Sequence, residues 1–237
     1  MITISAIKEY FKNLQNQNYE LIWAKTWDDT KKGIDWIADM PGISPGRWAV
    51  GYNYLYVMTR ILNDMRPRSV LEFGLGISST LISHYFNSQN MKDGIHDVIE
   101  HDEGWINFYK NKNRITEGCL IHLVECVEKK YNGCPYNAYA DISSVVENKK
   151  YDVISIDGPI GTEKYSRRDI LEFLPDILSD SFIIIMDDAQ RKGERSTIGD
   201  IKEILEKNQI DYTEGVYPGM TDCVVITSAD NKFICSL

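Results

Sequence analysis

The chain has 237 residues, 43% of them hydrophobic, which is enough to bury a substantial core in one large domain or two small ones. Its 35 acidic residues outnumber its 26 basic ones, and the resulting net charge of −9 argues against nucleic acid as the main partner. Apolar runs are far shorter than the ~20 residues of a membrane span, the N-terminus lacks a secretory pattern, and no cysteines are spaced as Cys-x-x-Cys. We therefore expect a soluble, cytoplasmic protein with reduced thiols and no membrane span.

Residues 1–66 carry a helical pattern. Ile7, Phe11 and Leu14 recur at helical spacing, and a second apolar set does so just before Pro67. Between the two helices lies a Pro- and Gly-rich loop that contains Arg47, which we expect to contact substrate. The segment is predicted to cap the site or to form a homodimer face.

Short apolar runs separated by helical patterns follow Pro67. Strands are predicted over 69–73, 96–100, 120–124, 151–156, 182–186, 209–213 and 223–228. The last two are joined by Pro218-Gly219-Met220 without a helix, so the last strand should run antiparallel. The pattern predicts an α/β fold over 67–237: a Rossmann-like doubly wound sheet, mostly parallel, preceded by N-terminal helices.

The first strand ends in a glycine turn. Gly74 and Gly76 allow a tight turn and close approach of a ligand, and a helix beginning near Ser78 offers free N–H groups. A dinucleotide fingerprint needs a third glycine, but Ser79 stands there, and the acidic Glu72 also departs from that pattern.

The second strand ends at Glu100, 24 residues after Gly76. A carboxylate in this position can accept the hydroxyls of a ribose. The alternative is a solvated helix-capping cluster, because His101-Asp102-Glu103 follows directly.

These residues resemble the first motif and the ribose-binding acid of the class I S-adenosylmethionine-dependent methyltransferases. The resemblance covers roughly residues 66–237 and implies S-adenosylmethionine as the cofactor. It places the glycine turn against the methionine portion, and Tyr139-Ala140-Asp141 at the adenine, although Asp141 could equally be a helix N-cap. The cofactor contacts expected are Glu72, Gly74, Gly76, Ser78, Ser79, Glu100, His101, Asp141 and Asp157.

Three carboxylates close the fourth and fifth predicted strands, namely Asp157, Asp187 and Asp188. Like charges at one spot need a cation or a proton to offset them, and oxygen ligands would select Mg²⁺ or a similar ion. The placement resembles the metal-dependent O-methyltransferases, whose sugar-methylating branch has an acidic pair at the second position. Without a metal, Asp157, Asp187 or His101 would act as the catalytic base, or the acids would simply cap turns.

Two predicted loops overhang the crevice, and Tyr165 and Arg191 in them are expected to bind substrate, unless their charges form local ion pairs in solvent. A helix is predicted to open at Tyr165. The expected activity is methylation of a hydroxyl on a small molecule, with a sugar or glycan precursor favoured. The rivals are an NAD(P)-dependent oxidoreductase and a catalytically inactive, cofactor-binding scaffold in polysaccharide assembly.

Overall fold

The computed structural model describes residues 3–38, 40, 42–43, 49–91, 93–112, 115–116 and 118–237. Arg47, which was predicted to contact substrate, lies outside these residues. Within them, no helix is both long enough and apolar enough to cross a membrane.

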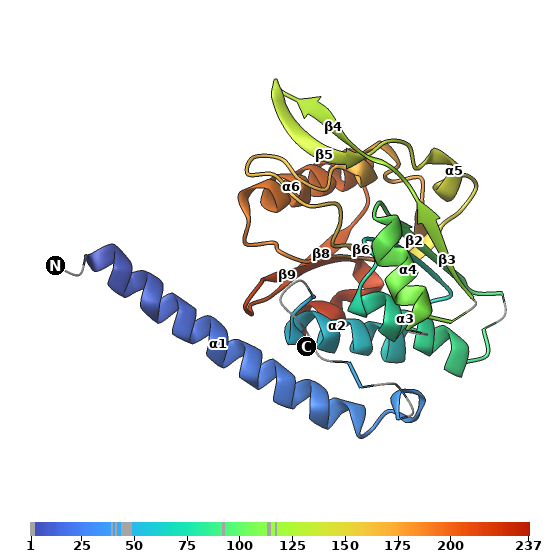
Figure 1. The fold of residues 1–237 in the computed structure, drawn as a ribbon, viewed down its shortest axis with the longest axis horizontal. Helices are drawn as coiled ribbons and strands as arrows, with labels where there is room; N and C mark the ends of the chain where they lie inside the picture. Colours follow the sequence, from blue (N-terminus) through green and yellow to red (C-terminus); the bar gives the residue numbers. More distant parts are fainter. Residues whose placement is uncertain are drawn as a thin grey trace.

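The centre of the molecule is a seven-stranded sheet in the order β3-β2-β1-β6-β7-β9-β8 (Figure 1). Its strands are β1 (Ser69–Phe73), β2 (Ile95–Glu100), β3 (Cys119–Leu123), β6 (Tyr151–Ile156), β7 (Leu178–Met186), β8 (Tyr212–Tyr217) and β9 (Cys223–Ser228). The pairings among β3, β2, β1, β6 and β7 are parallel, whereas β9 is antiparallel to both β7 and β8. The predicted mostly parallel sheet with an antiparallel last strand is confirmed.

Helices and short helical turns surround the sheet. They are α1 (Ile4–Lys31), η1 (Asp35–Ile37), α2 (Tyr52–Arg60), η2 (Ile61–Met65), α3 (Ile77–Ser88), α4 (Glu103–Asn111), α5 (Ser143–Val146), η3 (Asp169–Glu172), α6 (Lys192–Lys207) and η4 (Ala229–Ser236).

Successive residues of the central strands serve two separate cores. Val70 and Ile183 belong to one core together with Leu55 of α2 and with residues of α3 and η4. Their neighbours Leu71 and Ile184 face the other core, which contains the apolar side of α6. Because side chains alternate along a strand, continuously apolar strands fill both faces of a covered parallel sheet, as predicted.

Three predicted elements differ from the structure. β7 begins at Leu178 rather than 182, since the polar residues 179–181 also belong to the strand. β8 begins at Tyr212 rather than 209, because Gln209 adopts a left-handed backbone conformation (φ 57°) in the turn that ends α6. The helix predicted from Tyr165 is absent: Arg167 is also left-handed (φ 53°), and only the short η3 follows. The helical turn fails there because a left-handed residue cannot continue a right-handed helix.

A β-hairpin, β4 (Cys126–Tyr131) with β5 (Cys134–Tyr139), was not predicted. Asn132 and Gly133 form its turn with positive φ values of 48° and 74°, the conformation that Asn-Gly favours in two-residue hairpins. The hairpin follows directly on the carboxyl end of β3 and rises above the sheet (Figure 1).

The N-terminal helices pack differently from each other. α2 belongs to the sheet's core, and its Tyr54 hydroxyl lies 2.5 Å from the Ser155 hydroxyl of β6. Helix α1 rests on α2 by its second half, where Trp27 Nε1 donates to Thr59 Oγ1 at 2.9 Å, while its first half projects from the molecule (Figure 1). The division of the chain at residue 66 stays a prediction.

Candidate functional site

The carboxyl ends of four neighbouring strands bring most of the predicted residues to one edge of the sheet. Phe73 pairs with both Ile99 and Ile156, and Ile156 pairs with Met186, so the residues that follow each of them are neighbours. The strand order reverses between β1 and β6, which is where open sheets of this kind bind ligands.

The glycine turn after β1 is held against the turn after β6. Gly74 has φ +100°, and a Cβ added there would lie 3.3 Å from the backbone nitrogen of Gly158. A Cβ on Gly158 would lie 2.7 Å from Tyr139 Oη. By contrast, a Cβ on Gly76 would come no nearer than 4.0 Å to another residue, that being Ser78 Oγ. Space beside Gly76 is therefore open to a ligand.

Glu100 organises the same turn. Its Oε2 accepts from the backbone N–H of Leu75 at 3.0 Å, and its Oε1 accepts from the N–H groups of His101 and Asp102 at 2.6 and 2.9 Å. Each carboxylate oxygen can accept two hydrogen bonds, so Oε2 retains one acceptor position. The predicted contact of Glu100 with a ribose stays a prediction.

Trp105 supports the turn in a way that sequence reasoning missed. Its Nε1 donates to the carbonyl oxygen of Leu75 at 2.7 Å, and its ring stacks on Phe108 with centroids 5.3 Å apart. The sequence contained one signal for this role. Trp105 stands two residues after Glu103, where α4 begins, and so lies close to the end of β2.

Ser78 and Ser79 are buried at the start of α3. Ser79 Oγ accepts from the N–H of Gly76 at 3.1 Å, which ties the helix start to the glycine turn. Their predicted contact with the cofactor stays a prediction.

Glu72 lies within β1, fully buried, and its Oε2 is 2.7 Å from His96 Nε2 on β2. Burial alone would lower the pKa of His96, but interactions with Cys119 and Glu72 outweigh it and raise that pKa to about 10. The carboxylate is thus engaged in an ion pair inside the sheet, and its predicted cofactor contact stays a prediction.

His101 and Asp141 are placed at the rim. His101 Nδ1 lies 2.9 Å from Glu100 Oε1, and its ring meets the ring of Tyr139 edge-on with centroids 6.3 Å apart. Asp141 is exposed, and its Oδ1 accepts from the N–H of Ser143 at 2.8 Å, a bond that lowers the pKa of the carboxyl. Asp141 therefore makes the capping contact that was the alternative to an adenine contact, which stays a prediction.

The three strand-end carboxylates do converge. Asp157, Asp187 and Asp188 each offer an oxygen within 4.8 Å of the others. Burial and the neighbouring Asp188 raise the pKa of Asp187 to about 6. Burial also raises the pKa of Asp157, although Arg167 partly opposes the effect. Both shifts follow from crowding negative charge in a poorly solvated place.

Arg167 lies buried in the middle of this cluster, which sequence reasoning missed. Its Nη2 is 3.1 Å from Asp157 Oδ1 and 2.9 Å from Asp188 Oδ2, and its Nη1 donates to the carbonyl oxygen of Asp187 at 2.8 Å. On the far side its Nε lies 3.8 Å from a carboxylate oxygen of the buried Glu194. Its neighbour Tyr165 was expected in an overhanging loop, and the sequence gives no sign that Arg167 is buried there.

The residues predicted to bind substrate also have partners inside the protein. Arg191 is half exposed, and its Nη1 lies 2.7 Å from Asp188 Oδ2. The ring of Tyr165 meets that of Tyr131 of the hairpin edge-on, with centroids 4.9 Å apart. The ion pair of Arg191 is of the kind that the alternative interpretation expected, and substrate binding by Tyr165 and Arg191 stays a prediction.

The donor set suits a hard divalent cation, because three carboxylates are grouped closely enough to share one ion. Asp187 is the carboxylate least engaged by arginine, and its Oδ1 accepts from Thr221 Oγ1 at 2.9 Å. A cation that took Asp157 and Asp188 together would compete with the Arg167 guanidinium. The three carboxylates fit such an ion. When no ion is bound, the Arg167 guanidinium supplies the positive charge beside them.

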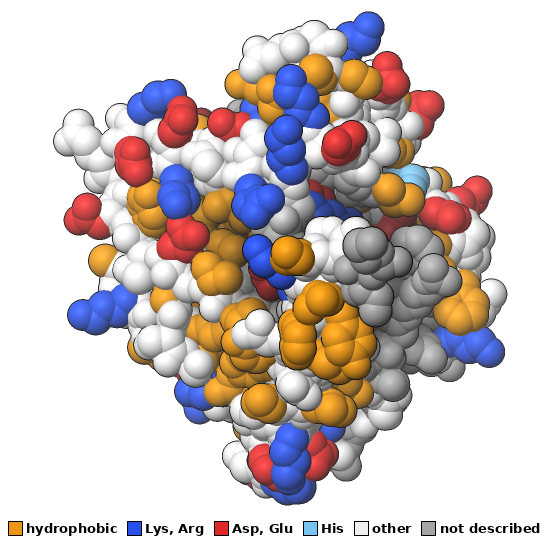
Figure 2. All heavy atoms as spheres, turned by 90° about the vertical axis from the view of Figure 1, so that its left-hand side faces the viewer, with side chains coloured by type: hydrophobic (Ala, Val, Ile, Leu, Met, Phe, Trp, Pro, Cys, Tyr) orange, Lys and Arg blue, Asp and Glu red, His pale blue; other side chains and the backbone are white. Residues whose placement is uncertain are grey.

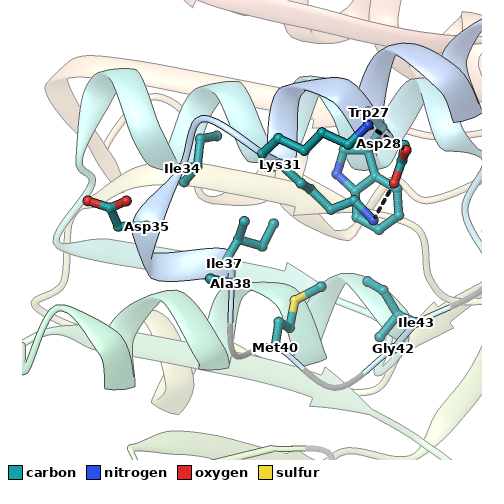
Figure 3. A pocket seen from close by; sticks show the side chains of 11 residues that line it. Trp27, Asp28, Lys31, Ile34, Asp35, Ile37, Ala38, Met40, Gly42 and Ile43 are labelled. Atoms are coloured by element: carbon teal, nitrogen blue, oxygen red, sulfur yellow. Dashed lines mark ion pairs between the residues drawn. The ribbon is translucent and has the colours of Figure 1, made fainter.

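A cavity of about 370 Å³ lies elsewhere, at the end of α1 (Figure 3). Its walls include Trp27, Ile34 and Met40, with Lys31 and Asp28 as an ion pair at one side. None of the strand-end residues lines it. We assign no part of the chemistry to this cavity.

Comparisons with known proteins identify structures of similar fold. Neither a family model nor a curated sequence matches the chain. Among solved structures, an O-methyltransferase from Bacillus cereus in complex with SAH has a TM-score of 0.51 at 13% identity, over 91% of this chain and 100% of that one. The O-methyltransferase NovP has a TM-score of 0.52 at 12% identity, over 75% of this chain and 80% of that one.

The chain therefore has the Rossmann-like fold of the class I methyltransferases. Both neighbours named above are O-methyltransferases. The antiparallel β9 between β7 and β8 also departs from the dinucleotide-binding pattern. The oxidoreductase alternative is not favoured.

Proposed function

We propose that the protein transfers the methyl group of S-adenosylmethionine to a hydroxyl of a small molecule, with a sugar or glycan precursor as the acceptor. One observation carries the proposal: the open glycine turn with Glu100 beside it lies next to a cluster of three carboxylates on the same edge of the sheet. The first half suits a nucleoside cofactor, and the second suits removal of a proton from the acceptor.

The part of the site formed by the glycine turn and Glu100 is proposed to bind and orient the cofactor. When bound, S-adenosylmethionine supplies a methyl group already activated by its sulfonium. Glu100 Oε2 would accept a ribose hydroxyl, while Gly76 leaves room for close approach and the first N–H groups of α3 face the same turn. Glu72, Ser78, Ser79, His101 and Asp141 are proposed as further contacts.

The part of the site formed by the three aspartates is proposed to accept a proton from the acceptor. A base is most effective when its pKa lies near the working pH, and burial has raised the pKa of both Asp157 and Asp187 toward that range. Where no cation is bound, we propose Asp187 as the base for the acceptor hydroxyl, because arginine engages it least among the three. His101, which contacts Glu100, is the second candidate.

A divalent cation of the Mg²⁺ class is part of the proposal, held by Asp157, Asp187 and Asp188. When bound it would lower the pKa of a hydroxyl that approaches it. The acidic pair at 187–188 resembles the sugar-methylating branch of the metal-dependent enzymes, and this supports a sugar over a phenol. Tyr165 and Arg191, which lie by the hairpin and the cluster, are proposed to line the acceptor's path, together with Arg47.

The test is transfer of a labelled methyl group from S-adenosylmethionine to a panel of glycosides and catechols. We expect turnover on glycosides, its loss in Asp187→Asn, and a strong decrease after treatment with a chelator. Unchanged activity after chelation and in Asp188→Ala would remove the metal from the account. Binding of the cofactor without turnover on any acceptor would favour the scaffold alternative.

A further inference from the structure

Helix α1 has two faces that differ in what they contact. Glu20, Trp23 and Trp27 face the molecule: Glu20 Oε1 accepts from the N–H of Tyr52 at 2.9 Å, and Trp23 Nε1 donates to the carbonyl oxygen of Pro218 at 2.7 Å. Residues 3–15, in contrast, are all exposed. The first half of the helix is thus held by nothing in its own chain that the structure describes.

The exposed face of α1 is largely apolar between Ile4 and Ile22. Ile4, Phe11 and Leu21 are 75%, 63% and 70% exposed. At about 100° of rotation per residue, the apolar side chains fall on the side opposite Trp23 and Trp27. The exposed members of this stripe are Ile4, Ile7, Tyr10, Phe11, Leu14, Leu21 and Ile22. A stripe of this size on a water-soluble molecule marks an interaction surface.

Figure 2 shows the molecule from the side on which α1 projects. Hydrophobic side chains gather there in the lower half of the view. Isolated apolar residues on a surface need no explanation, whereas a continuous group does.

The spacing of the stripe is that of a coiled coil. Its residues recur at alternating intervals of three and four, with Ile4, Phe11 and Asn18 at one seam position and Ile7, Leu14 and Leu21 at the other. A single Asn at the first of these positions favours a partner that presents another Asn at the same level. In a pair of identical parallel helices, Asn18 faces Asn18 of the second copy.

Charge supports a partner with the same sequence. In a parallel pair the residues flanking the seam meet as Thr3 with Lys8, Tyr10 with Gln15 and Gln17 with Ile22. No two like charges meet between Thr3 and Ile22. The next residues at the two seam positions are Lys25 and Asp28, so the paired stretch ends before them. The other charged residues of this stretch, Glu9, Lys12 and Glu20, lie away from the seam.

From these observations we infer that two copies of the chain associate through α1 as a parallel, in-register helical pair. The body of each copy is attached to the face of α1 opposite the seam, so the two bodies lie on the outside of the pair and do not obstruct it. The inference is independent of the proposed function.

Sedimentation velocity on the full chain over a wide concentration range tests the inference. We expect a species of twice the 27.3 kDa chain mass that dissociates on dilution. Phe11→Glu with Leu14→Glu should give a monomer with an unchanged melting temperature, because neither side chain contacts the body. The matched control, Ser5→Glu with Asn13→Glu, adds the same charge on the opposite face and should remain dimeric.

Cysteine cross-linking tests the register of the two α1 helices. Asn18→Cys should form a cross-linked dimer under oxidation far more readily than Asn13→Cys, with the wild-type chain showing the background from its native thiols. A wild-type chain that stays monomeric, including one that instead binds phosphatidylglycerol vesicles, overturns the inference. So does a dimer that survives the Phe11→Glu, Leu14→Glu change, or one in which Asn18→Cys does not cross-link.

Discussion

Arg167 decides the electrostatics of the acidic cluster, because its buried guanidinium faces Asp157, Asp188 and Glu194 at once. Removing one partner of a buried ion pair leaves uncompensated charge and costs about 3 to 5 kcal/mol. We therefore expect Arg167→Met to lower the free energy of unfolding by that amount in urea denaturation. Arg195→Met, on an exposed arginine of the same region, should be nearly silent.

The same variant tests cation binding without an activity assay. Because Mg²⁺ would no longer compete with a guanidinium, it should raise the melting temperature of Arg167→Met more than that of the wild type. Equal and negligible shifts in both proteins would contradict a cation site at this cluster.

Glu100 is the residue that we propose to link the strand end to the cofactor. Loss of its carboxylate should weaken binding of S-adenosylhomocysteine (SAH), the demethylated product, by tenfold or more, since a hydrogen bond to a charged group contributes about 1.5 to 3 kcal/mol. Titration calorimetry on Glu100→Ala measures this, with Glu103→Ala at the start of α4 as the matched control. An affinity equal to that of the wild type would show that the ribose lies elsewhere.

Asp169 carries a pH dependence of stability. Burial raises its pKa from 3.8 to about 6, although Oδ1 accepts from the N–H of Tyr139 at 2.8 Å. A raised pKa means that the folded state holds the proton more tightly than the unfolded state, so stability falls as pH rises from about 4 to 6 and then levels off. The expected loss from this group is about 3 kcal/mol.

Asp169→Asn keeps the oxygen acceptor and removes the titration. The free energies of unfolding of the wild type and Asp169→Asn should therefore be similar at the acidic end of this range and diverge in favour of the variant at neutral pH. Parallel curves across the range would show that Asp169 does not titrate in this way.

At the scale of the elements, the two turns after β1 and β6 use glycine for different reasons. Gly158 is required by packing, since an added Cβ would lie 2.7 Å from Tyr139 Oη and 3.0 Å from Gly74 Cα. Gly76 has open space around its Cα, which we assign to the ligand.

A pair of alanine variants separates these roles. Gly158→Ala should lower the melting temperature, whereas Gly76→Ala should leave it unchanged and weaken SAH binding. Unaltered SAH affinity in a folded Gly76→Ala protein would mean that the cofactor does not approach this turn.

The strands could be predicted from the sequence and the hairpin was not, for a physical reason. Buried parallel strands such as β6 and β7 are almost continuously apolar, and this pattern is read directly. Strand β4 is largely exposed and contains Lys129 and Lys130, so its strand character shows mainly in the Asn132-Gly133 turn that follows.

The candidate site was predictable to the same extent. Glu100 and the three aspartates were found because each directly follows or ends a strand, and parallel strands end at one edge. The burial of Arg167 depends on how a loop with a left-handed residue folds back across the sheet. Local sequence patterns do not predict such a contact.

For the molecule as a whole, part of the negative charge lies at the sheet's edge, where three aspartates converge and Arg167 and Arg191 offset some of their charge. Such a site suits a cationic sulfonium cofactor and a divalent cation better than an anionic dinucleotide. The fold shared with O-methyltransferases places this charge where open sheets bind their ligands.

The central claim is that this edge binds S-adenosylmethionine. Titration calorimetry of the wild-type chain with SAH, alongside NADH, tests it most directly. The account predicts one site per chain for SAH and no heat of binding for NADH. Binding of NADH with no measurable binding of SAH would contradict it.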